Sequence, residues 1–171
     1  GLGYWGPNLV RNFFEDPDFE VFAVCDQQSD RLSKVQGRYP RIQVTTDYED
    51  LLKNPAIDAI AIATPVSAHY DLAVKAMQAG KHVVTDKPMC LTLEEADAMI
   101  AAAQRAGVTL RVYENFVFYP PHVRAKELID AGEIGEPQMI RIHLNTGTRD
   151  TAWDVPLSSW LWRFDERRCG G

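Results

Sequence analysis

The sequence predicts an α/β fold: a doubly wound parallel sheet, followed by the start of an α+β domain with an open, mostly antiparallel sheet. Two observations predict the first part. Apolar, β-rich runs alternate along the chain with helical segments, and a glycine-rich turn precedes the first of those helices. Strands that alternate with helices favour right-handed crossovers and parallel pairing. A third observation concerns the second part, because the chain becomes aromatic and loses this alternation after about residue 114.

The first expected elements follow the glycine-rich turn. Apolar residues recur at helical spacing over 6–15, and Pro7 suits the first turn of a helix, where its missing N–H needs no partner. VFAVC at 21–25 is a continuous apolar run, typical of a parallel strand buried on both faces. A polar helix over 27–38 is expected next, ending before Pro40.

Three further strands are expected over 57–64, 81–88 and 108–113. The first, IDAIAIAT, is a second run typical of a buried strand. Thr92 and Glu95 fit an S/T-x-x-E capping box at the start of a helix that ends at Gly107. Four strands separated by helices therefore predict one parallel sheet.

A glycine motif and a carboxylate together predict a dinucleotide site of the Rossmann type. Gly1, Gly3 and Gly6 spell G-x-G-x-x-G, in which backbone N–H groups and a helix N-terminus can approach a pyrophosphate. Asp26 lies twenty residues after Gly6, at the end of the next strand, where an acid can accept hydrogen bonds from ribose hydroxyls. The carboxylate repels a 2′-phosphate, and the two glutamines after it supply no cation. NAD is therefore expected in preference to NADP.

Composition excludes several other classes of protein. The formal net charge of −6 argues against a nucleic-acid partner, and no apolar run is long enough to span a membrane. Cys25, Cys90 and Cys169 show no C-x-x-C spacing, so we expect reduced thiols in a cytoplasmic protein and no metal site.

Several motifs lie along the remaining chain. They are Ala63-Thr64-Pro65 with His69, Ala79-Gly80-Lys81-His82-Val83, Asp86-Lys87-Pro88, the stretch 132–137 and the run from Trp162-Arg163 to Gly170-Gly171. As a set they resemble the Gfo/Idh/MocA oxidoreductases, the family of glucose-fructose oxidoreductase and inositol dehydrogenase. With the opening turn, the resemblance implies cofactor contacts from Gly1, Gly3, Tyr4, Trp5, Gly6, Asp26, Ala63, Thr64, Pro65, His69, Asp86 and Lys87.

The resemblance also implies a catalytic residue. Lys87 corresponds to a family lysine beside the nicotinamide and the substrate, where an ammonium can bind a sugar hydroxyl and stabilise negative charge developing on its oxygen. A solvated lysine in a turn is the alternative. Asp86 departs from the family's usual Glu, which shortens its reach toward the ribose or Lys87. The Lys87-Pro88 bond is of the X-Pro type, for which the cis isomer is accessible.

Other positions carry weaker expectations. We expect His69 to pack or cap near the cofactor turn rather than to act as a catalyst. Substrate contacts are expected from Lys87, Tyr113 and Asn115, and the resemblance adds Trp162 and Arg163. The aromatic run 116–119 suits either a wall of a sugar site or packing at a domain junction.

The expected activity is hydride transfer between NAD(H) and a hydroxyl or carbonyl of a sugar, sugar nucleotide or cyclitol. A non-catalytic, dinucleotide-binding regulatory protein of the same fold is the alternative. We expect a dinucleotide-binding domain over 1–115 and the beginning of a substrate-binding and oligomerisation domain over 116–171. The chain starts at the first glycine, and the family's acid/base Asp and His would follow Gly171. We therefore expect a fragment, inactive alone, of a cytoplasmic homo-oligomer that binds a small sugar or polyol.

Overall fold

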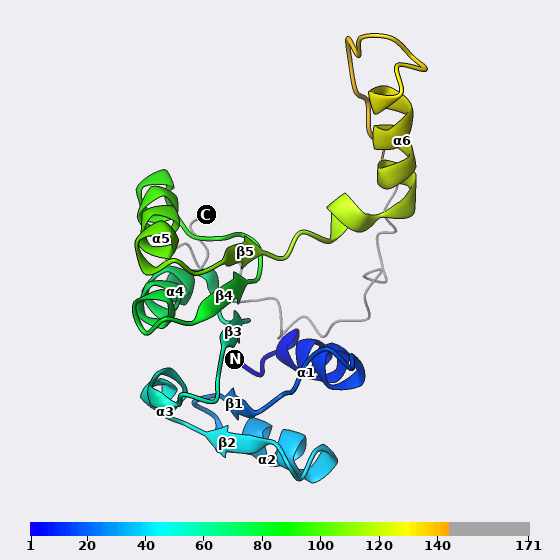
Figure 1. Ribbon diagram of the computed structural model, residues 1–171. Coiled ribbons are helices and arrows are strands. Elements are labelled where there is room, and N and C mark those ends of the chain that lie inside the picture. Colours follow the sequence, from blue (N-terminus) through cyan, green and yellow to red (C-terminus); the bar gives the residue numbers. More distant parts are fainter. Residues whose placement is uncertain (144–171) are drawn as a thin grey trace. The chain divides into compact units, whose positions relative to one another are not determined.

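The computed structural model describes residues 1–143, which form two units, one over 1–113 and one that begins at Glu114 (Figure 1). The first unit alternates helices and strands throughout. In chain order it contains α1 (Gly6–Glu15), β1 (Ala23–Cys25), α2 (Ser29–Arg38), β2 (Gln43–Thr45), α3 (Tyr48–Lys53), β3 (Ala59–Ile62), the 3-10 turn η1 (Val66–Ala68), α4 (His69–Gln78), β4 (His82–Thr85), α5 (Leu93–Ala106) and β5 (Leu110–Val112).

All the strand pairs are parallel, as the sequence predicts. β1 pairs with β2, and β3, β4 and β5 form a second group in that order. In the three-stranded group Ile62 pairs with Thr85, and Thr85 pairs with Val112. The last residues of these three strands therefore lie in one row, and the loops that follow them leave the sheet at the same edge.

The strand β1 lies between two hydrophobic cores. Val24 belongs to a core shared with α1 and α2, whereas Ala23 and Cys25 pack against a second core formed largely by α3, α4, α5 and the strands β3 and β4. Successive side chains of a strand point to opposite faces, so β1 contributes to both cores. Helices on both faces of parallel strands are the doubly wound arrangement that the sequence predicts.

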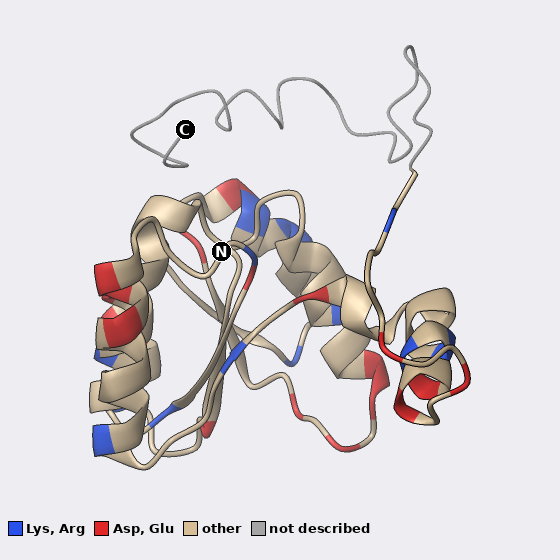
Figure 2. Ribbon diagram, turned by 90° about the horizontal axis from the view of Figure 1, so that it is seen from above, with Lys and Arg blue, Asp and Glu red and all other residues tan. Residues whose placement is uncertain are grey.

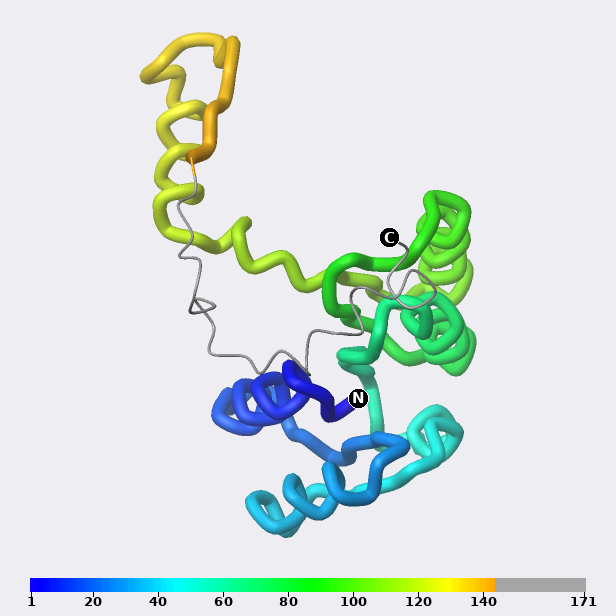
Figure 3. Tube along the Cα trace, turned by 180° about the vertical axis from the view of Figure 1, so that it is seen from behind, coloured from blue at the N-terminus to red at the C-terminus, as the bar shows by residue number. Residues whose placement is uncertain are grey.

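The first residues of the chain lie between the two groups of strands. Figures 1 and 3 both place the N-terminus near the end of β3, above the β1–β2 pair. Two contacts fix this position. The Leu2 N–H donates to Asp26 at the end of β1, and the Cα of Gly1 faces the carbonyl of Ala63 just after β3.

Two elements of the structure, β2 and α3, are absent from the sequence prediction, and the strand β3 is less buried than predicted. β2 and α3 are short, with three and six residues, so neither produces a clear periodic pattern. α3 does begin with a side-chain cap, since Asp47 accepts from the Glu49 N–H. In β3 only alternate residues are buried, because Ala59 and Ala61 remain exposed.

The second unit is helical over its described residues. It contains the 3-10 turn η2 (Asn115–Phe118) and α6 (Pro120–Asp130), and Gly132 follows with φ 74°, a conformation that favours glycine. The strand expected over 136–147 is wrong as far as 143, and its last residues lie outside the described part. Met139, Ile140 and Ile142 are exposed, and no neighbouring strand among residues 1–143 satisfies the backbone there.

The distribution of charged residues and the length of the apolar helices bear on which partners the described residues could bind. Figure 2 shows acidic and basic residues interspersed along the helices rather than gathered in one basic stripe. None of the helices in residues 1–143 is long and apolar enough to cross a membrane.

Candidate functional site

The glycine turn before α1 packs closely at two of its three glycines. A Cβ on Gly1 would lie 2.7 Å from the carbonyl oxygen of Ala63, and one on Gly6 would overlap the carbonyl oxygen of Gly1. A Cβ on Gly3 would meet nothing nearer than Arg31 Nη1, at 4.0 Å. The outer glycines are therefore required by packing, whereas the backbone at Gly3 is open to a ligand.

The N-terminus of α1 has no side-chain cap. Trp5 occupies the N-cap position with helical backbone angles and accepts backbone bonds from Asn8 and Leu9, but no side chain accepts from the first turn. Uncapped N–H groups together with the helix dipole favour an anion at this position. The first turn of α1, directly after the glycine turn, thus has backbone N–H groups without a side-chain acceptor.

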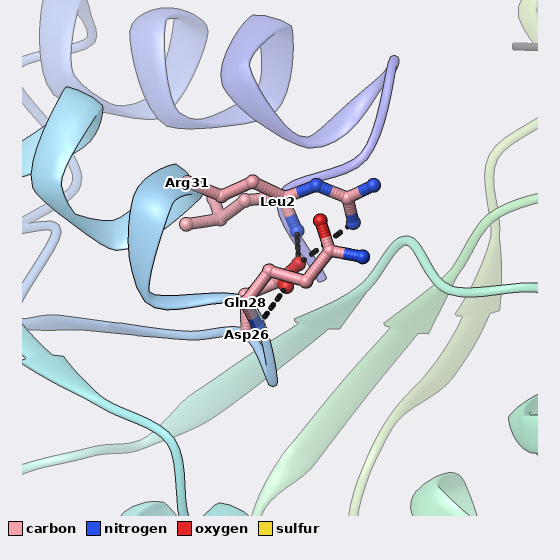
Figure 4. A network of polar contacts seen from close by, with 4 residues as sticks. All are labelled: Leu2, Asp26, Gln28 and Arg31. Carbon is pink, nitrogen blue, oxygen red and sulfur yellow. Dashed lines mark hydrogen bonds and ion pairs between the residues drawn. The ribbon is translucent and has the colours of Figure 1, made fainter.

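Asp26 lies at the end of β1 and is held by two backbone donors (Figure 4). Its Oδ2 accepts from the Leu2 N–H at 2.6 Å, and its Oδ1 accepts from the Gln28 N–H at 2.9 Å. The Arg31 guanidinium also contacts Oδ2, at 3.4 Å. Burial by itself would raise the pKa of Asp26, but the two backbone bonds and Arg31 outweigh it and lower the pKa below its usual range.

Arg31 corrects one step of the sequence argument. The two glutamines after Asp26 do lack charge, but the first turn of α2 brings Arg31 back onto the carboxylate. The expectation that no cation lies near Asp26 is wrong because it considered only the next two residues. A basic residue five positions after the acid, inside the following helix, was the signal in the sequence.

These residues fit the adenosine and pyrophosphate part of a dinucleotide. The open backbone at Gly3 and the uncapped end of α1 could accept phosphate oxygens, and Asp26 could accept from ribose hydroxyls. Close packing fixes the path of the turn, since Gly1 leaves no room for a side chain beside Ala63 after β3, and Gly6 leaves none beside Gly1.

A second cluster lies where β3, β4 and β5 end. The row formed by Ile62, Thr85 and Val112 brings the next residues of each strand, Ala63, Asp86 and Tyr113, to one edge. Backbone bonds extend this alignment, since the Asp86 N–H donates to the Ile62 oxygen and the Tyr113 N–H donates to the Thr85 oxygen.

Three hydroxyls near this edge are buried without a hydrogen-bond partner in the described part of the chain. They belong to Thr64, Thr85 and Tyr113. Burial raises the pKa of Tyr113 to about 12, and the Asp86 carboxylate adds to the shift. At neutral pH this phenol therefore keeps its proton and is a hydrogen-bond donor.

Lys87 lies at the same edge with its side chain exposed. Its bond to Pro88 is cis, the isomer that the sequence left open. Asp86 Oδ1 accepts from the backbone N–H of Lys87 at 2.8 Å, so the shortened carboxylate is in contact with this turn. Among residues 1–143 the Lys87 ammonium has no ion-pair partner.

His69 is buried between two loops of the site. Its Nδ1 lies 3.0 Å from the Pro88 oxygen and its Nε2 lies 2.9 Å from the Thr64 oxygen. With only 1% of its surface exposed and both ring nitrogens against carbonyl oxygens, it has no free edge for a cofactor. The geometry instead makes His69 a brace between the loop after β3 and the turn that carries Lys87.

The remaining predicted site residues are divided between the units. Tyr4 is 45% exposed, and its ring lies 6.1 Å from that of Trp5. Asn115 opens η2 in the second unit. Trp162 and Arg163 lie outside the described residues.

Two other features of the described residues bear on ligand binding. No group of three His, Cys, Asp or Glu side chains among residues 1–143 is placed to hold a metal ion. A mainly apolar cavity of about 300 Å³ lies against α5 and β5, and none of the predicted site residues lines it. Its wall includes Met89, Ile100, Ala103, Val108, Leu110 and Val112.

Comparison with known proteins agrees with this geometry. Residues 1–114 match the GFO_IDH_MocA model, described as an oxidoreductase family with an NAD-binding Rossmann fold. The chain is 35% identical over 150 residues to a scyllo-inositol 2-dehydrogenase (NAD(+)) of Bacillus subtilis, covering 87% of this chain and 42% of that protein. It is 30% identical over 147 residues to a scyllo-inositol 2-dehydrogenase (NADP(+)) of the same organism, covering 84% of this chain and 41% of that protein.

A solved structure is similar in fold as well. The WlbA dehydrogenase from Bordetella pertussis, in complex with NADH and UDP-GlcNAcA, aligns with a TM-score of 0.74 and 28% identity, covering 79% of this chain and 39% of that one. The chain thus spans about two-fifths of the length of these relatives.

Proposed function

Because the chain belongs to the Gfo/Idh/MocA oxidoreductase family with its NAD-binding Rossmann fold, we propose that the protein is an NAD(P)-dependent dehydrogenase acting on a CH–OH group. The substrate class is a sugar, sugar nucleotide or cyclitol, the classes that the similar proteins' names contain. The observation that carries the proposal is that the glycine turn and Asp26 meet in one place, while the Lys87 ammonium is unpaired at the same strand-end edge.

We propose that each end of the site has its own task. The turn over 1–6 receives the pyrophosphate, Asp26 the adenosine ribose, and Lys87 the reacting substrate oxygen. When bound, a nicotinamide ring supplies the group that accepts or donates the hydride. The Lys87 ammonium stabilises negative charge on the substrate oxygen, and the neutral Tyr113 hydroxyl donates a hydrogen bond nearby.

NAD is the proposed preferred cofactor. A buried carboxylate with a lowered pKa is ionised at neutral pH, and it repels a 2′-phosphate while accepting from a 2′-hydroxyl. The relatives include both an NAD(+) and an NADP(+) enzyme, so family membership alone does not decide between the two.

The second candidate function is a dinucleotide-binding regulatory protein without turnover. Asp86, in place of the family's usual Glu, favours it. This alternative shares the cofactor site but needs no ammonium at Lys87, so the two proposals differ in what a Lys87 variant changes.

Further proposals concern the whole protein. Residues 116–171 would begin a substrate-binding and oligomerisation domain, and the protein would act as a homo-oligomer. A cytoplasmic location suits Cys25 and Cys90, which are both free thiols.

The test uses the chain together with any flanking sequence that its gene encodes. Absorbance at the NADH band is followed with a panel of sugars, sugar nucleotides and inositols, and NADH binding is titrated separately by fluorescence. Turnover with any of these supports the dehydrogenase. Tight NADH binding without turnover supports the regulatory protein, and the absence of both contradicts the cofactor site.

A further inference from the structure

Four aromatic side chains gather at the C-terminal ends of α1 and α2, which lie on the same side of the β1–β2 pair (Figure 1). The ring centroids of Phe13 and Phe19 are 4.9 Å apart, and those of Phe14 and Tyr39 are 4.5 Å apart. Because Phe13 and Phe14 are neighbours in α1, the two pairs are continuous, and we call the four rings the aromatic surface. Phe14 is 50% exposed and Phe19 is 54% exposed. Contiguous exposed apolar side chains favour a protein partner.

The aromatic surface has an acidic flank beside Phe19. Residues 15–20, at the end of α1 and in the loop after it, carry four carboxylates and no basic side chain. The four residues, all exposed, are Glu15, Asp16, Asp18 and Glu20. None of these carboxylates forms an ion pair within residues 1–143. The acidic flank therefore carries an unbalanced negative charge.

The other flank, beside Tyr39, is basic. The Arg38 guanidinium lies over the Tyr39 ring, 5.3 Å from its centroid, and Arg41 follows two residues after Tyr39. Both arginines are exposed, and neither takes part in an ion pair in the described part of the chain. Acidic and basic groups thus border one aromatic surface without neutralising each other.

This distribution of charge decides which partner the aromatic surface fits. A basic protein would be attracted by the carboxylates and repelled by the arginines, and an acidic protein would meet the reverse. A second copy of the chain satisfies both flanks, because a two-fold axis places each acidic flank opposite the basic flank of the other copy. An aromatic centre with a charged border is also the usual composition of a protein–protein interface.

We propose that the aromatic surface is a self-association surface, at which two copies of the chain pair about a two-fold axis. Phe14 and Tyr39 of each copy cover the same side chains of the other, and the arginines of each meet the other's acidic flank. This surface is separate from the oligomerisation domain proposed over 116–171. It lies at the opposite end of α1 from the glycine turn, and the ten residues of that helix span about 15 Å. Pairing here therefore leaves the candidate site open and does not depend on the proposed function.

Two complementary sets of charge reversals test the pairing. The acid-reversed variant carries Glu15→Lys, Asp18→Lys and Glu20→Lys, and the base-reversed variant carries Arg38→Glu and Arg41→Glu. In each variant alone, both flanks have the same sign of charge, so two copies repel each other. In an equimolar mixture of the two, every flank again faces a flank of opposite charge.

The mass of each assembly is measured by sedimentation at about 100 μM protein, with the chain carrying any flanking sequence that its gene encodes. Each variant alone should have half the mass of the wild type, and the mixture should regain the wild-type mass. Raising the salt from about 0.05 to 0.5 M should weaken the wild-type pairing about tenfold. The matched control combines Asp97→Lys and Arg105→Glu, at exposed positions of α5, and should keep the wild-type mass.

Phe19→Ala keeps the test valid if a charge variant unfolds, since it removes a half-exposed ring without changing any charge. It should weaken the pairing about tenfold. A monomeric wild type, charge variants that keep the wild-type mass, or a mixture that does not regain it would each overturn the self-association surface. None of these results would affect the proposed dinucleotide site, whose test is cofactor binding.

Discussion

At the β1 end of the candidate site, both oxygens of Asp26 have hydrogen-bond partners, whereas at the β4–β5 end the Lys87 ammonium and the Tyr113 hydroxyl have none among residues 1–143. The first end is organised by backbone N–H groups that can hold their geometry before any ligand arrives. The second end carries donors whose acceptors would have to come from a ligand. In the proposed function, cofactor recognition at Asp26 and chemistry at Lys87 are therefore separated along one edge of the strands.

The largest expected effect is at Lys87, where β4 and β5 end. Lys87→Met should lower kcat by about 10²–10³, because loss of one positioned donor to a developing oxyanion has that magnitude. NADH affinity should change little, since the proposed pyrophosphate and adenosine contacts come from the turn over 1–6 and Asp26. Steady-state kinetics and a fluorescence titration measure the two quantities. Lys75→Met, at an exposed position on α4, is the control.

If Lys87→Met retained full turnover, the lysine would be a solvated turn residue. The proposed separation of cofactor recognition at Asp26 from chemistry at Lys87 would then be wrong. A fall in NADH affinity as large as the fall in kcat would instead assign Lys87 to cofactor binding.

Within the glycine turn, Gly6 and Gly3 are expected to respond differently to substitution by alanine. Gly6→Ala should destabilise the fold by about 1–3 kcal/mol, because the new Cβ overlaps the carbonyl oxygen of Gly1. Gly3→Ala should leave the free energy of unfolding nearly unchanged, because the nearest atom to a Cβ there is Arg31 Nη1, at 4.0 Å. The same Cβ should weaken NADH binding about tenfold by occupying the approach to the backbone.

Urea unfolding and NADH titration of both variants test this pair. Equal stabilities would contradict the close packing at Gly6, and normal NADH affinity in Gly3→Ala would contradict the approach of a ligand at Gly3.

The elements that meet at this site were easier to predict from the sequence than the side-chain contacts within it. The glycine turn and Asp26 were predictable because each depends on a local pattern and on the rule that parallel strands end at one edge. The short elements β2 and α3 were not, because three and six residues are too few to show a period. Arg31 was missed because a helical turn brings together residues that the sequence separates.

His69 illustrates the same limit. The motif predicted packing near the cofactor turn, and the structure supplies what no pattern could: the carbonyls of Thr64 and Pro88, from two separate loops, converge on its ring. Those contacts depend on how β3, α4 and β4 pack. The strand expected over 136–147 failed as far as residue 143 for a related reason, because alternation does not make a strand without a neighbour to pair with.

A smaller effect is expected at His69, which contacts both the loop after β3 and the turn after β4. His69→Leu should cost about 1–3 kcal/mol, because it removes a buried imidazole whose two ring nitrogens contact the carbonyl oxygens of Thr64 and Pro88. It should lower kcat more than NADH affinity, since it loosens the turn that carries Lys87. His82→Leu, at an exposed position in β4, should cost less. Equal losses in the two variants would show that His69 is not a brace.

The smallest expected effect is the pH dependence of stability. The pKa of Asp26 is lowered from an ordinary value of about 3.9, so its carboxylate stabilises the fold above that pH. The contribution is lost as pH falls through the lower pKa of the folded state. The stability difference between wild type and Asp26→Asn should be constant from about pH 5 to 8 and shrink in acid. A difference that grew in acid would contradict the sign.

The most direct test maps NADH binding onto the backbone by ¹H–¹⁵N NMR. If the glycine turn and the strand ends are the dinucleotide site, NADH should shift the amide signals of Leu2, Gly3, Asp26, Thr64 and Lys87, and leave Ile100 and Val108, beside the apolar cavity, unmoved. Shifts confined to the residues around that cavity, with the glycine turn unaffected, would contradict the account.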